Sequence, residues 1–211
     1  MVNGEYECLN SSKLSKLSLN LQSQKSKRSN LFSLKNIDSS WTLFIDRDGV
    51  INHEKHLDYI HTWDEFKFYD GVKEAMEIFS KKFSFIIMIT NQRGIAKGLT
   101  KLEDLQVIHK NMLQEIEDAG GRIDKIYFCA DMESPNRKPN PGMGLQAVKD
   151  FPGIDLSKSI MVGNTLSDMK FGRNLGVAVN IFLSTTQKDM ALPHEDIDLV
   201  FNDLISVAKA L

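Results

Sequence analysis

The stretch "WTLFIDRDGV", residues 41–50, runs from a short apolar segment directly into two aspartates and a glycine. Residues 41–46 have the length and apolar content of a buried β-strand, which places Asp46 and Asp48 at the carboxyl end of that strand. Two carboxylates at this spacing repel each other. The pair therefore indicates a cation site, a catalytic acid–base couple or the N-terminal cap of a helix, and other parts of the chain must distinguish these alternatives.

Composition is typical of a soluble globular protein. The chain has 211 residues, of which 42% are hydrophobic and 26% are charged, and its formal net charge is −2. The length suits one α/β domain, and the small net charge gives no reason to expect nucleic acid or an anionic membrane as a partner. Cys8 and Cys129 are too few for a disulfide framework, and no apolar run is long enough to span a bilayer. We therefore expect a cytoplasmic protein, and the sequence is compatible with a monomer.

The first 40 residues differ in composition from the rest of the chain. They hold ten serines and six Lys or Arg residues but only three acids. Such a biased segment has too few apolar residues for a core of its own. We expect residues 1–40 to form a flexible or loosely docked extension without chemistry, and residues 41–211 to form a single domain.

From Trp41 onward, strand-like and helix-like segments alternate. Short apolar runs predict strands at 41–46, 83–90, 125–130, 159–164 and 177–183. Helical patterns separate them at 71–81, 101–119, 142–150 and 165–175, and a last one follows near 202–210. Thr100 is expected to cap the second helix, with Glu103 at the capping-box spacing. Buried strands that alternate with helices predict an α/β fold: a Rossmann-like three-layer sandwich around a central, mainly parallel sheet.

Polar residues follow four of these strands at the point where each strand ends. The clusters are Asp46 and Asp48; Thr90, Asn91, Gln92 and Arg93; Arg137 and Lys138; and Asn164, Thr165 and Asp168. Any one cluster could consist of ordinary turn formers or helix caps. Because the carboxyl ends of parallel strands meet at one edge of the sheet, four clusters together indicate a ligand site there.

The residue types in these clusters suit phosphate chemistry. The acids need a hard cation among them, and oxygen-only ligation favours Mg²⁺. The side chains of Lys138 and Arg137 and the Thr90 hydroxyl are donors with no evident internal acceptor, which suits a phosphate. A site with both properties indicates phosphoryl transfer, and a carboxylate can then act as the nucleophile.

Four motifs carry a family resemblance. "DRDGV", "TNQRGIAKG", "RKPNPGM" and "VGNTLSDM", in this order, resemble the motifs of the haloacid-dehalogenase (HAD) superfamily phosphatases over about residues 41–190. The most similar branch is a small-capped one, without a large cap domain, that contains heptose 1,7-bisphosphate and histidinol-phosphate phosphatases. The resemblance implies a Mg²⁺-dependent phosphatase for a small phosphorylated metabolite. A sugar bisphosphate such as D-glycero-D-manno-heptose 1,7-bisphosphate is expected, and histidinol phosphate or another phosphomonoester is the alternative.

The resemblance also implies roles for individual residues. Asp46 would attack phosphorus and form an aspartyl-phosphate, while Asp48 would act as general acid and then as general base. One Asp46 oxygen and the main-chain carbonyl of Asp48 would hold Mg²⁺. Thr90 would bind the transferring phosphoryl group, and Lys138 would neutralise its charge and orient Asp46. Arg137 resembles the residue that reads a second phosphate. The remaining implied pocket residues are Asn52 and Tyr59, from the segment 51–61, together with Asn91 and Gln92.

Asn164 departs from the pattern, because the family usually has a metal-ligating aspartate there. An amide oxygen can still coordinate Mg²⁺, but the site loses one negative charge and metal affinity should weaken. Asp168 would compensate through a water molecule or by pairing with Lys138. The alternative of another class is a catalytically weak HAD-like binding or regulatory module, with residues 1–40 as its partner contact.

A second departure concerns zinc. Zinc-containing relatives carry a Cys-x-His and Cys-x-Cys loop before the Arg-Lys pair, whereas this chain keeps only Cys129 and has Asp131 in the place of the histidine. Structural zinc needs four ligands. We therefore predict a protein that uses Mg²⁺ and no zinc.

Overall fold

The computed structural model describes residues 33–211, and residues 34–211 form one compact unit. Most of the extension expected at residues 1–40 therefore lies outside the described residues. Its last part does not: a 3₁₀ turn, η1 (Leu34–Asn36), comes before the first strand. The side chains of Leu34 and Ile37 are buried, and Lys82 donates a hydrogen bond to the Ile37 carbonyl.

The core of the unit is one six-stranded sheet in which every pair of neighbouring strands is parallel. The strand order is β3-β2-β1-β4-β5-β6. The strands are β1 (Thr42–Ile45), β2 (Phe85–Asn91), β3 (Lys125–Cys129), β4 (Ser159–Gly163), β5 (Val179–Leu183) and β6 (Leu199–Phe201). The predicted α/β class and parallel sheet are thus confirmed. The edge strand β6 is short and partly exposed, which is why apolar run length does not reveal it.

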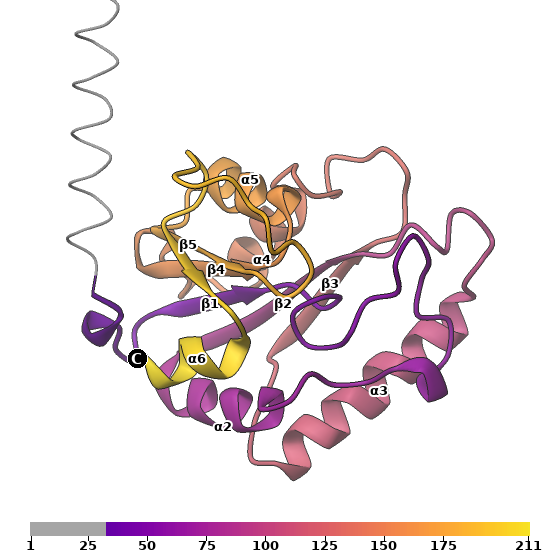
Figure 1. Cartoon of the computed structure of the whole chain (residues 1–211), viewed down its shortest axis with the longest axis horizontal. Helices are drawn as coiled ribbons and strands as arrows, with labels where there is room; N and C mark the ends of the chain where they lie inside the picture. The colour runs from indigo at the N-terminus through magenta and orange to yellow at the C-terminus, as the bar shows by residue number, and fades with distance from the viewer. Residues whose placement is uncertain (1–32) are drawn as a thin grey trace, which may run out of the picture. The chain divides into compact units, whose positions relative to one another are not determined.

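Helices cover both faces of the sheet. One layer holds α2 (Val72–Lys82), α3 (Leu102–Asp118) and α6 (Leu204–Lys209), and the other holds α4 (Gly142–Asp150) and α5 (Leu166–Leu175) (Figure 1). Two further 3₁₀ turns are η2 (Trp63–Glu65) and η3 (Leu156–Lys158). Within residues 33–211, no helix combines the length and the apolar character needed to cross a bilayer.

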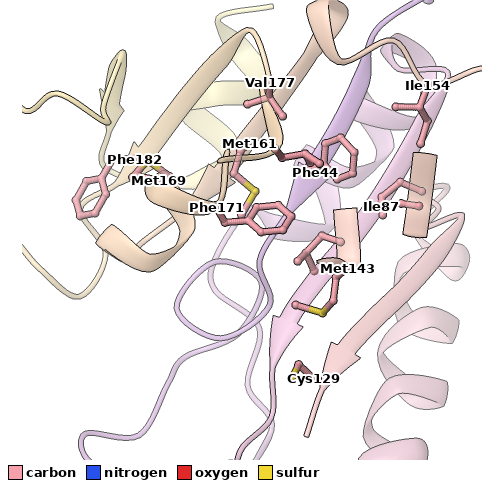
Figure 2. Packing of buried hydrophobic residues seen from close by; sticks show 13 residues of the cluster. Phe44, Ile87, Cys129, Met143, Ile154, Met161, Met169, Phe171, Val177 and Phe182 are labelled. Atoms are coloured by element: carbon pink, nitrogen blue, oxygen red, sulfur yellow. The ribbon is translucent and has the colours of Figure 1, made fainter. Parts of the chain in front are cut away.

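An apolar cluster fills the space between the sheet and the α4/α5 layer. Phe44 of β1 and Met161 of β4 meet Met143 of α4 and Phe171 of α5 there, and all four side chains are buried (Figure 2). All residues of β1, β4 and β5 are buried because both faces of these central strands are covered. This packing fixes the carboxyl ends of the strands, on which the site is built.

The expected helix cap at Thr100 is wrong. α3 begins one residue later than that cap requires, with Lys101 as N-cap and no side-chain cap hydrogen bond. The Thr100 hydroxyl instead pairs with the ring Nδ1 of His61 at 2.9 Å, which ties the loop after β1 to the start of α3. A capping box occurs at α5, where Thr165 and Asp168 hydrogen-bond each other through side chain and backbone.

Candidate active site

A cavity of about 330 Å³ lies at the carboxyl ends of the central strands. Its walls include members of all four strand-end clusters, although the clusters are distant in the sequence: Asp46, Asp48, Thr90, Asn91, Gln92, Arg137, Lys138 and Asp168. The parallel sheet brings these residues together, as its strand order requires. The loop between β1 and α2 adds Glu54, Lys55, Asp58 and Tyr59 to the wall.

Asp46, Lys138 and Asp168 form a buried ion-pair network on the cavity floor. The Lys138 ammonium lies 2.7 Å from Asp46 Oδ1 and 2.6 Å from Asp168 Oδ1, and it also donates to the Ile89 carbonyl at 2.8 Å. These acceptors correct the expectation that Lys138 has no internal acceptor, and they agree with the expected contact with Asp46 and the expected pairing of Asp168 with Lys138. Its three donors are already used, so it serves to neutralise and orient Asp46. Burial, followed by the nearby Asp168 charge, raises the pKa of Asp46 to about 7, although Lys138 opposes the shift.

Asn91 holds the lysine in place. Its side-chain Oδ1 accepts from the Lys138 backbone N–H at 3.0 Å, and its Nδ2 donates to the Lys138 carbonyl at 3.1 Å. This reciprocal pair joins the end of β2 to the loop before α4. Asn91 is therefore a support for the Arg137–Lys138 loop as well as part of the cavity wall.

Asp48 has its own cation, separate from that of Asp46. The Arg47 guanidinium lies 2.8 Å and 3.0 Å from the two Asp48 oxygens, while Asn52 and Gln92 donate to the same carboxylate. Although burial opposes them, Arg47 and these amides lower the pKa of Asp48. The repulsion implied by the two aspartates is thus relieved by Lys138 on one side and by Arg47 on the other. This favours the ionised form of Asp48, which can accept a proton, so the general-acid role implied by the resemblance requires that Asp48 is protonated first.

Arg47 and His109 are site residues that sequence reasoning missed. Arg47 is only 1% exposed, and its Nη1 lies 3.1 Å from Nε2 of His109 on α3. A guanidinium can only donate, so His109 accepts through Nε2 and is neutral in this arrangement. Burial, followed by the charge on Arg47, lowers the pKa of His109 to about 3.

The lowered pKa of His109 predicts a loss of stability in acid. The unfolded chain takes up a proton near the ordinary histidine value of about 6.5, whereas the folded chain does not, so stability falls as the pH drops below that value. His109→Gln keeps an acceptor for Arg47 but does not titrate. We expect the wild type to lose about 1 to 2 kcal/mol more than His109→Gln between pH 7.5 and pH 5. Urea unfolding of both proteins in EDTA measures the difference, and identical pH dependence would contradict this account.

Gln92 connects the strand-end cluster that follows β2 to Asp48. Its Nε2 donates to Asp48 Oδ2 and to Thr90 Oγ1, both at 2.8 Å, so the Thr90 hydroxyl proton remains available to the cavity. Asn52 differs from the expectation that it lines the pocket. It is fully buried, and its Nδ2 donates to Asp48 Oδ1 and to the His53 carbonyl. Asn52 therefore holds the Asp48 carboxylate by a hydrogen bond from the protein interior.

Basic side chains surround Tyr59 in the cavity wall. The Tyr59 hydroxyl accepts from Arg93 Nε at 2.6 Å, and Lys97 lies 5.5 Å from the Tyr59 ring centroid. Hydrogen bonds from Lys97 and Arg93 outweigh burial and lower the pKa of Tyr59. Arg137 also lines the cavity, and its buried Nη1 has no hydrogen-bond partner within residues 33–211. Arg93 was not assigned a role from sequence, although it stands beside Gln92 in the second motif.

Asn164 is not part of the cavity lining, but it carries an oxygen that fits a hard cation. Asn164 is fully buried, its Nδ2 donates to Thr186 Oγ1 at 2.9 Å, and its Oδ1 has no hydrogen-bond partner in the described part of the chain. A buried carbonyl oxygen without a donor is a ready ligand for Mg²⁺. Asp168 is not placed as a direct ligand: Oδ1 pairs with Lys138, and Oδ2 accepts from Thr165.

Within residues 33–211, there is no group of three or more His, Cys, Asp or Glu side chains that could hold a metal ion. A cation at this site would thus need amide or carbonyl oxygens as well as carboxylates. Cys129 is a buried free thiol whose Sγ lies 4.0 Å from the Asp131 carbonyl oxygen. The absence of zinc stays a prediction.

Comparison with known proteins agrees with this site. The model of the family described as polynucleotide kinase 3 phosphatase matches residues 42–208. A D-glycero-alpha-D-manno-heptose-1,7-bisphosphate 7-phosphatase of Campylobacter jejuni is 38% identical over 148 residues, which cover 70% of this chain and 84% of that protein. The D-glycero-beta-D-manno-heptose-1,7-bisphosphate 7-phosphatase of Haemophilus ducreyi is 33% identical over 175 residues, covering 78% and 94%.

A solved structure extends the likeness to the fold. The crystal structure of D,D-heptose 1,7-bisphosphate phosphatase from B. bronchiseptica, complexed with magnesium and phosphate, superposes with a TM-score of 0.71 at 28% sequence identity. The match covers 80% of this chain and 96% of that one. This chain belongs to the HAD-superfamily phosphatases, in the branch of the D-glycero-D-manno-heptose 1,7-bisphosphate phosphatases.

Proposed function

We propose that this enzyme removes the 7-phosphate from a D-glycero-D-manno-heptose 1,7-bisphosphate. The observation that carries the proposal is the arrangement of charge around one cavity. A nucleophile already paired with its own lysine lies on the floor, while the additional guanidinium groups of Arg93 and Arg137 lie in the wall. The partnerless Nη1 of Arg137 is suited to a second phosphate that a monophosphate lacks. The names of the relatives from Campylobacter jejuni and Haemophilus ducreyi support the same substrate.

The chain's own residues would then act in a definite order. Asp46, oriented by Lys138, would attack the phosphorus and form an aspartyl-phosphate, and the sugar oxygen would leave with a proton from Asp48. Asp48, whose ionised form is favoured by Arg47, would next take a proton from the water that hydrolyses this intermediate. The Thr90 hydroxyl, held by Gln92, would donate to a phosphoryl oxygen throughout.

Mg²⁺ would be held by the Asp46 carboxylate, the Asp48 main-chain carbonyl and the Asn164 side-chain oxygen. When bound, it supplies charge that stabilises the phosphoryl oxygens and offsets repulsion between phosphate and carboxylate. No zinc site is proposed. The family-model description suggests a polynucleotide 3′-phosphate as another substrate, and histidinol phosphate is the alternative from the sequence. Measuring phosphate release from each compound distinguishes them.

We expect substrate selectivity that depends on Arg137. Phosphate release with Mg²⁺ should be fastest for a heptose 1,7-bisphosphate, compared with histidinol phosphate, a 3′-phosphorylated oligonucleotide and an aryl phosphate. Arg137→Ala should lower kcat/KM for the heptose bisphosphate by at least about tenfold, because a charge-assisted hydrogen bond is lost. The same variant should leave the aryl phosphate nearly unchanged, since that compound has no second phosphate. Equal losses on both substrates, or preference for the oligonucleotide, would contradict the proposal.

A further inference from the structure

Asn164 lies where the family has an aspartate, and its surroundings hold it tightly. It follows β4 directly and is fully buried. Gly49, with φ +82°, packs against the Asn164 amide so closely that a Cβ at position 49 would come 1.9 Å from Nδ2. Only glycine permits this close approach of the two residues, because any side chain at position 49 would collide with the Asn164 amide. The amide cannot turn aside, and the orientation of its two polar atoms decides what it offers to a cation.

Thr186 determines that orientation. Asn164 Nδ2 donates to Thr186 Oγ1 at 2.9 Å. An amide donates only through its nitrogen, so Nδ2 faces Thr186. The Asn164 Oδ1 atom consequently points elsewhere, and it is the buried atom that has no hydrogen-bond partner within residues 33–211.

Glu54 also brings negative charge to this part of the cavity. It comes from the loop between β1 and α2, lines the cavity, and is close enough to Asp48 and Asp168 for their charges to raise the pKa of its carboxyl. Partial burial is the largest cause of that shift, and the donors Thr186 and Asn164 oppose it. A carboxylate placed among other carboxylates is costly unless a cation is present.

We propose that Glu54 compensates for Asn164 at the Mg²⁺ site. Glu54 lines the cavity together with Asp46 and Asp48 and supplies there the negative charge that an aspartate at position 164 would carry, while Thr186 directs the amide so that Oδ1 is presented to the cation. The inference rests on the Mg²⁺ binding included in the proposed function, but not on the identity of the sugar. Thr186 is a positioning residue for the same amide, because its hydroxyl accepts from Asn164.

The test is direct Mg²⁺ binding to the full chain without substrate, measured by isothermal titration calorimetry. Glu54→Gln should raise the Mg²⁺ dissociation constant about five- to tenfold, since fewer charges surround the ion. In an Asn164→Asp background the charge is restored in place, and the same Glu54→Gln change should shift the constant by less than about twofold. Thr186→Val should weaken binding only where Asn164 is retained. Glu74→Gln, which removes an exposed carboxylate on α2, is the matched control and should have no effect.

Unfolding curves in EDTA confirm that each variant is folded before titration. Unchanged Mg²⁺ affinity in both Glu54→Gln and Thr186→Val would overturn the inference, even if the enzyme hydrolyses the heptose bisphosphate normally. An equal loss from Glu54→Gln in the wild-type and Asn164→Asp backgrounds would also overturn it, because Glu54 would then act independently of Asn164. Coupled Mg²⁺ binding in a protein that leaves heptose bisphosphate intact would support the inference and contradict the proposed substrate.

Discussion

Asp46→Asn should reduce phosphate release by at least about a thousandfold at saturating substrate and Mg²⁺, because an amide cannot attack phosphorus and form the covalent intermediate. The structure predicts that this loss occurs without unfolding. Asp46 and Asp168 share a single buried cation, Lys138. Removing one of the two carboxylate charges leaves a balanced Lys138–Asp168 pair, so the metal-free variant should be at least as stable as the wild type near pH 8.

Asp48→Asn is the matched control for the nucleophile. It retains Asp46 and Lys138 but loses the acid–base group, so turnover should fall while a phosphorylated protein can still form. Mass spectrometry of acid-quenched samples should detect phosphate on the Asp48→Asn chain and none on the Asp46→Asn chain. Turnover above about one per cent of wild type in Asp46→Asn would exclude Asp46 as the nucleophile.

The parallel α/β class and the location of the site could be predicted from local patterns. Strands such as β2 and β4 are apolar runs buried on both faces, and a parallel sheet must align their carboxyl ends. Residues such as Thr90 and Lys138 were therefore expected in one cavity, and they line it. β6 gives no such signal because it is short and partly exposed.

The partners of individual polar side chains could not be predicted in the same way. Arg47 lies between two aspartates in the sequence, but its second contact, His109, comes from a helix 62 positions later. Asn52 follows the aspartates closely, yet the chain turns so that it lies beneath Asp48. Such contacts depend on side-chain packing between separate elements, which residue spacing does not encode.

Lys138 was predicted in part. Residue types alone left its ammonium as a free phosphate donor, whereas the family resemblance implied that it orients Asp46 and allowed a pairing with Asp168, 30 positions away. The fold brings both carboxylates and the Ile89 carbonyl to the ammonium, and the carbonyl contact has no signal in the sequence. This burial makes the lysine important for stability as well as for chemistry.

Lys138→Met should destabilise the metal-free protein by about 3 to 5 kcal/mol at pH 7.5, in addition to its effect on turnover. Lys138 is 4% exposed, and its removal leaves the Asp46 and Asp168 carboxylates buried without a cation. Both would then ionise less readily in the folded chain than in the unfolded chain. A carboxyl whose folded pKa is raised loses stability as the pH increases, so the defect should be smaller at pH 5 than at pH 7.5.

Two further variants make this prediction specific to the buried charges. Adding Asp168→Asn to Lys138→Met removes one of the two uncompensated carboxylates, so the double variant should be more stable than Lys138→Met itself. Lys149→Met, on the exposed side of α4, should change stability by no more than about 0.5 kcal/mol. Urea unfolding in EDTA at both pH values measures all three proteins. A loss below about 1 kcal/mol in Lys138→Met would mean that water, and not Lys138, compensates the two carboxylates in the free enzyme.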